Sequence, residues 1–341
     1  MITFKPKQVT KKLLAALPDR ARDVLERRFG LGKDGSIHTL ESIGQNYGVT
    51  RERVRQIENY GIQSIQKSEV YQEFAEVFQE LQNAIDALGG GVMAEQVLLE
   101  EITKDETLRN HIYFLLVLGD PFYRSKENPA YVHRWYTERK IAETVETALK
   151  NVYKTLSEDE LVSEDEILNR FRNELIEIAD KYDDTVLKRW LMISKEIGMT
   201  PLGEWGPASS PNVRVKGIRD YAYLAVKRHG SPMHFKEVAG AINELFGKKA
   251  HTATTHNELI KDERFVLVGR GLYALSEWGY SAGVVKDVLR DILEAHGPLT
   301  RDEIIDRVRK ERYVKDNTIV VNLQDMNLFK RLPNGSYTVA E

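Results

Sequence analysis

Four polar side chains that lie within six consecutive residues have the types that recognise bases in duplex DNA. These residues are Arg51, Glu52, Arg55 and Gln56. Arginine hydrogen-bonds well to guanine and glutamine to adenine, while glutamate accepts a hydrogen bond from cytosine. On a helix their spacing places them on the outer, N-terminal surface, with Val54 and Ile57 pointing inward. The pattern indicates a helix that enters the major groove, and a solvated helix face with internal salt bridges is the alternative.

The residues before this helix predict the element that positions it. Apolar residues fit two helices packed across a tight turn, namely Leu40, Ile43, Tyr47, Val49, Val54 and Ile57. Gly48 can adopt the left-handed conformation that ends the first helix. Thr50 is a good N-cap for the second helix. Because Arg53 stands where a capping box would have Glu, we expect a one-sided cap.

Residues 13–67 resemble region four of primary-type bacterial sigma factors, which recognises the upstream (minus thirty-five) promoter element. The match includes residues 17–20, 24–25, 28–31 and 39–58. The resemblance implies that the four residues named first contact bases: Arg51, Glu52, Arg55 and Gln56. It also implies that Thr39 and Leu40 contact the DNA backbone, and we expect backbone contacts from Thr50 and Arg53 as well. The resembling segment covers about a sixth of the chain.

Two departures from that family change the expected behaviour. After Glu58 such sigma factors continue with a basic, alanine-rich helix, whereas residues 59–67 contain Gly61 and a single lysine, Lys67. Fewer cations mean fewer phosphate contacts, so we expect this segment to bind DNA weakly by itself. We also find no segment that resembles the sigma region that melts the downstream promoter element and binds the polymerase clamp. A complete, free-standing sigma factor is therefore not expected.

Composition limits the class of protein. With 341 residues and 42% hydrophobic content, the chain can form several small cores. The absence of cysteine excludes disulfides, thiolate metal sites and cysteine nucleophiles. No apolar run approaches the ~20 residues of a membrane span, and residues 1–5 lack the apolar core of a signal peptide. We expect a cytoplasmic, nucleoid-associated protein.

Charge is unevenly distributed along the chain. Residues 1–67 contain 13 Lys and Arg and 7 Asp and Glu, whereas the remainder contains 36 and 45. A basic N-terminal segment followed by an acidic body suits a protein whose first part meets DNA and whose body meets another partner.

One sequence phrase occurs four times in the body. It consists of a short turn, a residue able to cap a helix and an amphipathic helix, at residues 90–98, 160–168, 230–238 and 297–305. Plausible β-hairpins follow the copies, most clearly at residues 264–275 and 329–339. Helices followed by a hairpin form the winged-helix plan. We therefore predict a mainly α fold with small β-hairpin wings, in which an N-terminal helix-turn-helix precedes tandem winged-helix domains.

The third copy has a resemblance of its own. Residues 214–280 are similar to the HARE-type winged helix, whose bacterial members include the N-terminal domain of the RNA polymerase delta subunit. Residues 233–238, 262–266, 269–275 and 278–280 carry the similarity. Members of that family bind DNA, attach to polymerase or tether DNA-modifying enzymes, so the resemblance implies a nucleic-acid context.

These observations predict six segments, with a Pro- and Ser-containing linker at 203–211. They are a sigma region four-like helix-turn-helix (1–67), a connecting helix (68–88), two winged-helix-like segments (89–138 and 139–206), a HARE-type winged helix (212–280) and a C-terminal winged-helix-like segment (281–341).

Catalytic and metal chemistry find little support. The eight histidines lack the spacing of a metal site, and acidic clusters at residues 158–160 and 164–166 sit where helices begin, which favours the helix dipole. We expect no enzyme activity, no cofactor, no metal and no small-molecule substrate. Aromatic and basic residues at 113–140 suit either the core of a hairpin or the stacking of unpaired bases.

The sequence thus predicts a transcription factor that acts at bacterial RNA polymerase, with sigma-like promoter recognition or regulation of initiation. The expected partners are double-stranded, promoter-like DNA and RNA polymerase core subunits. One alternative is a DNA-binding adaptor of a restriction, modification or defence system. Another is an inhibitor that occupies the sigma-docking site of polymerase.

Overall fold

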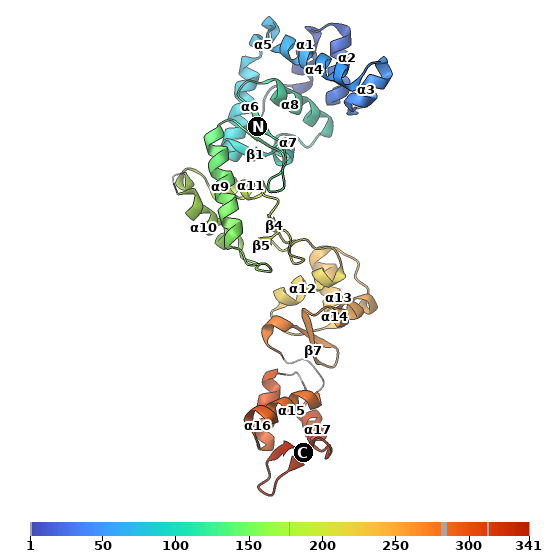
Figure 1. Ribbon diagram of the computed structural model, residues 1–341, viewed down its shortest axis with the longest axis vertical. Coiled ribbons are helices and arrows are strands. Elements are labelled where there is room, and N and C mark those ends of the chain that lie inside the picture. The colour runs from blue at the N-terminus through green and yellow to red at the C-terminus, as the bar shows by residue number, and fades with distance from the viewer. Residues whose placement is uncertain (1, 177, 281–284, 312–313, 341) are drawn as a thin grey trace. The chain divides into compact units, whose positions relative to one another are not determined.

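The computed structural model describes residues 2–176, 178–280, 285–311 and 314–340. The protein is mainly helical with small antiparallel sheets, as predicted (Figure 1). It divides into two compact units: unit 1 comprises residues 1–199 and 203–209, and unit 2 comprises residues 200–202 and 210–341. The division at 209–210 falls inside the segment expected to be a linker, although residues 205–207 form a strand of unit 1. Within the described ranges no helix is long and apolar enough to cross a membrane.

Unit 1 begins with four helices that form the head of the molecule. They are α1 (Pro6–Ala15), α2 (Asp19–Phe29), α3 (Leu40–Tyr47) and α4 (Arg51–Gln66). Pro6 at the first position of α1 suits a helix start, because the N–H that proline lacks would have no partner in the helix. Gly30 ends α2 in the left-handed conformation, with φ 63°.

The connecting helix predicted at residues 68–88 is wrong as a single element. The chain forms α5 (Glu69–Glu73) and α6 (Ala75–Gly89), which are separated by Phe74 at φ −101° and ψ 16°. Val77, Phe78, Leu81 and Ile85 are buried on one face of α6. That face belongs to the core shared with the head, so α6 is a structural helix and not an exposed connector.

After α5, the same order of elements occurs four times: a helix, an extended residue or strand, two helices and a hairpin. The first repeat, residues 75–136, contains α6, β1 (Val92–Ala94), α7 (Glu95–Ile102), α8 (Glu106–Leu118), β2 (Tyr123–Ser125) and β3 (Arg134–Tyr136). The second repeat, residues 139–207, contains α9 (Arg139–Thr155), α10 (Glu164–Leu175), η1 (Ala179–Lys181), α11 (Asp184–Leu191), β4 (Ile197–Met199) and β5 (Trp205–Pro207).

Unit 2 contains the other two repeats. The third, residues 218–278, contains α12 (Ile218–His229), β6 (Met233–His234), α13 (Phe235–Phe246), α14 (Thr252–Lys261), β7 (Phe265–Gly269), β8 (Leu272–Leu275) and η2 (Ser276–Trp278). The fourth, residues 285–339, contains α15 (Val285–His296), α16 (Arg301–Glu311), α17 (Asp316–Leu323), β9 (Phe329–Arg331) and β10 (Tyr337–Val339). The boundary predicted at 280–281 touches residues 281–284, which lie outside the described residues.

A common pairing links the four repeats. In each, the residue two positions before the second helix pairs antiparallel with an aromatic residue of the hairpin's last strand. The pairs are Met93 with Trp135, Val162 with Trp205, Met233 with Tyr273, and Leu299 with Tyr337. The segments expected to be turns therefore also add an extended residue to each hairpin, and the register is the same in all four copies.

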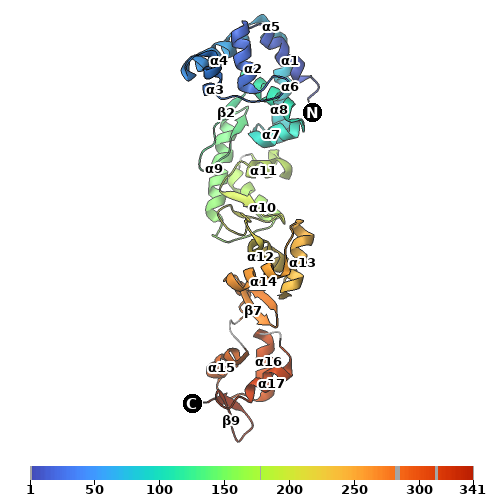
Figure 2. The same ribbon diagram turned by 90° about the vertical axis from the view of Figure 1, so that its right-hand side faces the viewer.

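Helix α8 joins the first repeat to the head. Ile112, Phe114, Leu115, Leu116 and Leu118 of α8 are each fully buried. They belong to one hydrophobic cluster with residues of α1, α2 and α4, and Figure 2 shows α8 beside α1 and α2. The head is therefore completed by a helix that lies some hundred residues further along the chain.

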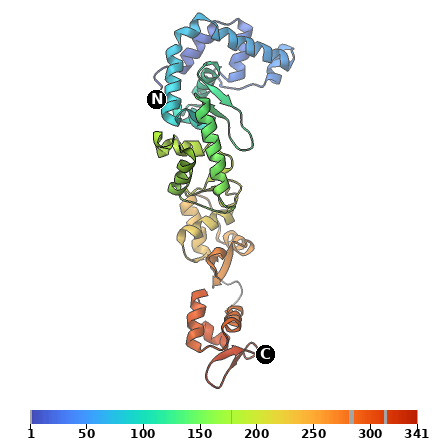
Figure 3. The same cartoon turned by 60° about the vertical axis from the view of Figure 1, so that its left-hand side comes forward.

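The second repeat is bonded to the first. Trp190 of α11 donates its indole N–H to Gly89 O at 2.7 Å. The tip of the β2–β3 hairpin is bonded to the segment after α11, with Val132 N donating to Ile193 O at 3.0 Å. The same hairpin lies beside α9 (Figure 3), where Arg134 pairs with Glu146 at 2.5 Å. These contacts make unit 1 a single body.

Candidate nucleic-acid interface

The helix-turn-helix predicted from residues 39–58 forms as α3, a turn and α4. Val24, Ile43 and Val54 are fully buried between α2, α3 and α4, with Leu40, Tyr47, Val49 and Ile57 packed against them. Gly48 ends α3 at φ 63° and ψ 34°, the left-handed conformation predicted for it. The apolar spacing and the turn glycine thus placed both helices correctly.

Threonine side chains begin both helices. Thr50 Oγ1 accepts a hydrogen bond from Arg53 N at 3.2 Å, which is the one-sided cap expected from the sequence. Thr39 Oγ1 caps α3 in the same way, accepting from Ser42 N at 3.1 Å. These caps fix where α3 and α4 begin, and with them the orientation of the first turn of α4.

Gly44 is a structural requirement that the sequence analysis missed. A Cβ atom at this position would lie 2.7 Å from Val49 O, closer than real Cβ atoms approach a backbone oxygen. Gly44 O also accepts a hydrogen bond from Val49 N at 3.0 Å. The glycine therefore allows the turn to fold back onto α3. The available signal was a glycine inside a predicted helix, where glycine costs about 1 kcal/mol relative to alanine.

A second missed feature ties α2 to α3. Asp23 accepts hydrogen bonds from Arg27 Nε at 2.7 Å and from Tyr47 Oη at 2.6 Å. The guanidinium of Arg20 lies 5.1 Å from the centre of the Tyr47 ring. The hydrogen bond to Asp23, followed by burial, raises the pKa of Tyr47. This group holds α3 against the rest of the head.

The structure brings the four predicted base-reading residues together. Arg51, Glu52, Arg55 and Gln56 are all exposed in the first two turns of α4. Arg55 donates two hydrogen bonds to Glu52, at 2.9 and 2.7 Å, and this contact lowers the pKa of the Glu52 carboxyl. Arg53, expected to face phosphate or solvent, donates to Gln56 Oε1 at 3.1 Å.

These intrahelical pairs fit the alternative interpretation of a salt-bridged helix face. Their strength decides whether they would prevent contacts to bases. Exposed pairs three or four residues apart on a helix contribute only about 0.2–0.5 kcal/mol. A bidentate contact to the correct base is worth about 1–3 kcal/mol of discrimination. DNA can therefore replace the intrahelical partners at little cost, and the surface keeps the capacity to bind bases.

The predicted backbone contacts lie at two helix N-termini. Thr39 and Thr50 are exposed caps, and Leu40 is the first residue of α3. The side chain of Leu40 packs in the core, so its backbone N–H is the group that a phosphate would meet. Helix N-termini carry partial positive charge and free N–H groups, which suits phosphate.

One face of the second half of α4 is used for packing. Gly61 is buried, and a Cβ there would lie 3.0 Å from Leu25 Cδ1 of α2. Ile65 is fully buried, and Gln66 Nε2 donates to Leu118 O of α8 at 2.9 Å. This face of the helix packs against α2 and the first repeat, while Asn59, Tyr60 and Gln63 remain exposed.

The aromatic segment at residues 113–136 is hairpin and helix core. Phe114, Phe122, Tyr131, Trp135 and Tyr136 are buried. Two neighbouring cations are also engaged, since Arg124 pairs with Glu95 and Arg134 with Glu146. Tyr123 is 49% exposed and stacks on Tyr136. These contacts favour the hairpin-core interpretation over stacking of unpaired bases.

Histidines also have packing roles. The ring of Phe235 lies between those of His234 and His256, with centres 4.3 and 4.2 Å away. Among the residues that the structure describes, no group of three or more His, Asp or Glu is placed to hold a metal ion.

Comparison with known proteins identifies the head. Residues 13–67 match the family model described as Sigma-70, region 4. RNA polymerase sigma factor SigA of Lactococcus lactis subsp. cremoris is 48% identical over 54 residues, which are 16% of this chain and 15% of that protein. RNA polymerase sigma factor SigA of Nostoc sp. is 58% identical over 48 residues, 14% of this chain and 12% of that protein.

The shared segment is a small part of each relative. The chain spans about 12–15% of the length of the sigma factors it matches, so the similarity concerns the head alone. The predicted resemblance of residues 13–67 to sigma region four is confirmed, and this segment carries a helix-turn-helix with an exposed second helix.

Proposed function

We propose that this protein is a DNA-binding regulator of transcription that acts at bacterial RNA polymerase, with promoter-like recognition by the head. The observation that carries the proposal is the exposed first half of α4 within a segment that matches sigma region four. Arg51, Glu52, Arg55 and Gln56 would contact base edges in the major groove. Thr39, Leu40, Thr50 and Arg53 would contact the backbone. The site uses no cofactor and performs no catalysis.

The repeats would act as winged-helix modules that contact flanking DNA or polymerase subunits. Their element order, helix, extended residue, two helices and hairpin, supports this assignment. We assign the third repeat to the HARE type, as its sequence suggests. The body has two differently charged parts: residues 75–209 contain 15 Lys and Arg against 26 Asp and Glu, whereas residues 210–280 contain 11 against 7. The third repeat is thus better suited to DNA and the first two to a protein partner.

Packing within unit 1 restricts where polymerase could bind. Leu13, Leu25 and Phe29 of the head are covered by the apolar face of α8. A protein partner would therefore meet the head on its polar surfaces, or would bind the repeats. The same packing means that residues 1–67 do not form a complete core by themselves. Unit 1 is the compact unit that contains the head together with the helices that cover it.

Base recognition can be tested by selecting the preferred DNA sequence with the full chain and measuring binding by fluorescence anisotropy. Replacing Arg55 or Gln56 with Ala should cost about 1–3 kcal/mol and relax the preference at one position. Arg53→Ala should weaken binding to all sequences about equally. Gln63→Ala, an exposed change in the second half of α4, serves as the control. If Arg55→Ala and Gln56→Ala bind the selected sequence like wild type, α4 does not read bases.

Cooperation between head and body requires a second measurement. Two weak sites on one chain raise each other's effective concentration, so the full chain should bind its target more tightly than unit 1 alone. The comparison is made with and without RNA polymerase, because the second site would bind either DNA or polymerase. Equal affinity of unit 1 and the full chain under both conditions would show that unit 2 adds nothing to target binding.

A second candidate function is a DNA-binding adaptor for modification or defence enzymes. The acidic first and second repeats favour a protein-docking role, which either function could use. Affinity purification from the native cell separates the two: polymerase subunits support the first proposal, and nucleases or methyltransferases support the second. Polymerase binding with reduced transcription in vitro would indicate an inhibitor that occupies the sigma-docking site.

A further inference from the structure

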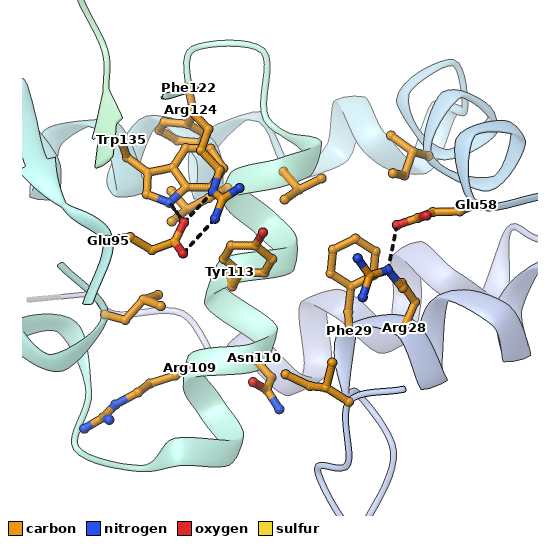
Figure 4. A pocket seen from close by; sticks show the side chains of 15 residues that line it. Arg28, Phe29, Glu58, Glu95, Arg109, Asn110, Tyr113, Phe122, Arg124 and Trp135 are labelled. Carbon is orange, nitrogen blue, oxygen red and sulfur yellow. Dashed lines mark hydrogen bonds and ion pairs between the residues drawn. The ribbon is translucent and has the colours of Figure 1, made fainter. Parts of the chain in front are cut away.

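A cavity of about 610 Å³ lies between the head and the first repeat, inside unit 1 (Figure 4). The head supplies one wall from α2, α4 and Ile37, and the first repeat supplies the other from α7, α8, β2 and β3. This volume is within the range of sites that hold small molecules. Helix α4 contributes Glu58 and Ile62 to the cavity, and both residues follow the four predicted base-reading residues along the helix.

Aromatic rings form the middle of the cavity. Tyr113 lies between Phe29 and Trp135, with ring centres 6.0 Å away on each side. The Tyr113 ring is tilted by 39° to Phe29 and by 79° to Trp135, so the three rings present both faces and edges. A planar ring can pack against such a surface with favourable offset or edge-to-face geometry.

One wall holds a charged pair whose hydrogen-bonding capacity is incompletely used. Arg28 Nε lies 3.4 Å from Glu58 Oε1. Within the described residues, this buried nitrogen makes no hydrogen bond of good geometry. Burial raises the pKa of the Glu58 carboxyl against the opposing effect of Arg28. The carboxylate is thus poorly solvated, and a ligand that donates hydrogen bonds to it would relieve that cost.

The opposite wall is satisfied internally and serves as a fixed surface. Glu95 accepts from Arg124 Nε at 2.5 Å and from Trp135 Nε1 at 2.9 Å. Arg124 lies over the Tyr113 ring at 5.5 Å. Arg109, whose side chain is 24% exposed, lines the cavity further along α8. Arg109 Nε donates to Thr103 O at 3.1 Å and its guanidinium lies 3.9 Å from Glu100, so both guanidinium groups of this wall already have acidic partners.

We propose that this cavity binds a guanine nucleotide. Guanine offers adjacent N–H donors on one edge and acceptors at O6 and N7, so it matches a carboxylate and a guanidinium that lie side by side. In this arrangement Glu58 accepts from the base, Arg28 donates to it, and the ring packs against Phe29 and Tyr113. The cavity thereby recognises the base of the nucleotide.

Adenine lacks this match. Its Watson–Crick edge places an acceptor where guanine has a donor, so a carboxylate would face the adenine N1 lone pair. A bound guanine nucleotide would touch both walls and so stiffen the contact between α4 and the first repeat. Nucleotide binding would thereby stabilise the part of α4 that follows the residues proposed to contact DNA.

The experiment uses the full chain without DNA, so its result does not depend on the proposed function. GMP and GTP are compared with AMP and ATP by isothermal titration calorimetry. We expect guanine nucleotides to bind at least tenfold more tightly than their adenine counterparts. Glu58→Gln should abolish that preference, while Tyr113→Leu, which removes the aromatic ring that the base packs against, should reduce affinity several-fold. Tyr60→Phe, at an exposed position on α4, should leave nucleotide binding unchanged.

Each outcome decides the matter. Because Glu58→Gln also removes the partner of Arg28, its thermal unfolding is measured in parallel, and Tyr113→Leu, whose unfolding is measured as well, provides an independent test in a protein that keeps the ion pair. Saturable binding with guanine preference that both variants weaken supports the site. No binding at millimolar GMP and GTP overturns the proposal. Equal binding of guanine and adenine nucleotides, or binding that neither variant changes, overturns it as well.

Discussion

The first and third repeats have the same order of elements but differ in how much of the third helix is buried. In the first repeat, six residues of the third helix, α8, are buried: His111, Ile112, Phe114, Leu115, Leu116 and Leu118. In the third repeat, the corresponding helix α14 buries only Thr255 and Leu259. In the first repeat the third helix packs against the head, whereas in the third repeat most of the corresponding helix is exposed to solvent.

The hairpin of the first repeat is also more covered than the hairpin of the third repeat. The tip of β2–β3 is bonded to the segment after α11, whereas Leu267 of β7 is 45% exposed. The order of elements therefore does not determine which surface a repeat offers to a partner. The neighbouring part of the chain determines it, by covering one helix and leaving another free. For this reason we propose DNA contacts for the third repeat and a supporting role for the first.

The largest expected effect tests the difference in burial directly. Leu116→Ala in α8 should lower the free energy of unfolding of unit 1 by about 2–5 kcal/mol, because it leaves a cavity in a shared core. Ile260→Ala in α14, where the side chain is 61% exposed, should change stability by less than about 0.5 kcal/mol. Urea unfolding of the full chain measures both. Similar losses for the two variants would contradict the contrast.

A second prediction concerns the charged surface near α14. Lys248 and Lys249 are exposed just before this helix. If they contact phosphates, the double change to Glu should weaken DNA binding and lower the slope of log affinity against log salt by about 1.8, since each contact contributes about 0.9. The matched double change of the exposed Lys104 and Lys126 in the first repeat should leave the slope nearly unchanged. Salt titrations by fluorescence anisotropy give both slopes.

Helix-interior glycines provide a third, smaller contrast. Alanine is normally about 1 kcal/mol better than glycine inside a helix. Gly61→Ala should nevertheless destabilise the protein, because the new Cβ would press against Leu25 at 3.0 Å. Gly240→Ala in α13 should stabilise it by about 1 kcal/mol, because no atom lies within 4 Å of the added Cβ. Thermal unfolding reports the two signs, and the same sign for both would contradict the packing described for α4.

The packing of Gly61 is an example of a feature that local sequence patterns do not predict. Periodicity, the Thr50 cap and Gly48 were enough to place α3, the turn and α4, because those signals are local. The use of Gly61 depends on α2, and the burial of α8 depends on a face of the head that is about a hundred residues away. Local patterns carry no record of such distant partners. The break at Phe74 was missed for the same reason, since apolar spacing continues across it.

The candidate site residues also differ in whether local spacing or distant packing determines their role. The four proposed base-reading residues could be named because their spacing on one helix is sufficient to group them. Asp23 and Gly44, which hold α3 in place, could not be assigned roles without knowing which backbone and side chains approach them. The cavity between the walls of unit 1 was likewise beyond prediction, because Glu58 and Tyr113 meet there only through tertiary packing.

The smallest expected effect is a pH dependence of the contact between α8 and the head. His111 is buried, its Nδ1 lies 2.7 Å from Thr10 Oγ1, and burial followed by the charge of Lys7 lowers its pKa. The folded state therefore binds this proton less readily than the unfolded state. The contribution to stability is fully present above the unfolded pKa of about 6.5 and is lost as pH falls toward the lowered folded value.

Urea unfolding of unit 1 between pH 8 and pH 5 checks this sign. His111→Gln should flatten the loss of stability on acidification, while His229→Gln, an exposed change in the third repeat, should leave the full chain's profile as in wild type. A His111 variant that loses stability with acid as steeply as wild type would show that this side chain does not titrate with folding.

The distance along the chain between Thr10 and His111 also has a consequence for synthesis. Ribosomes add about 5–20 residues per second, so α1 emerges about 5–20 s before α8 is made. Throughout that interval the apolar face of the head, including Leu13 and Leu25, has no cover from its own chain. The nascent head is therefore exposed to aggregation or to chaperone binding until residue 118 has left the ribosome, and slow codons between residues 90 and 118 would prolong that vulnerable period.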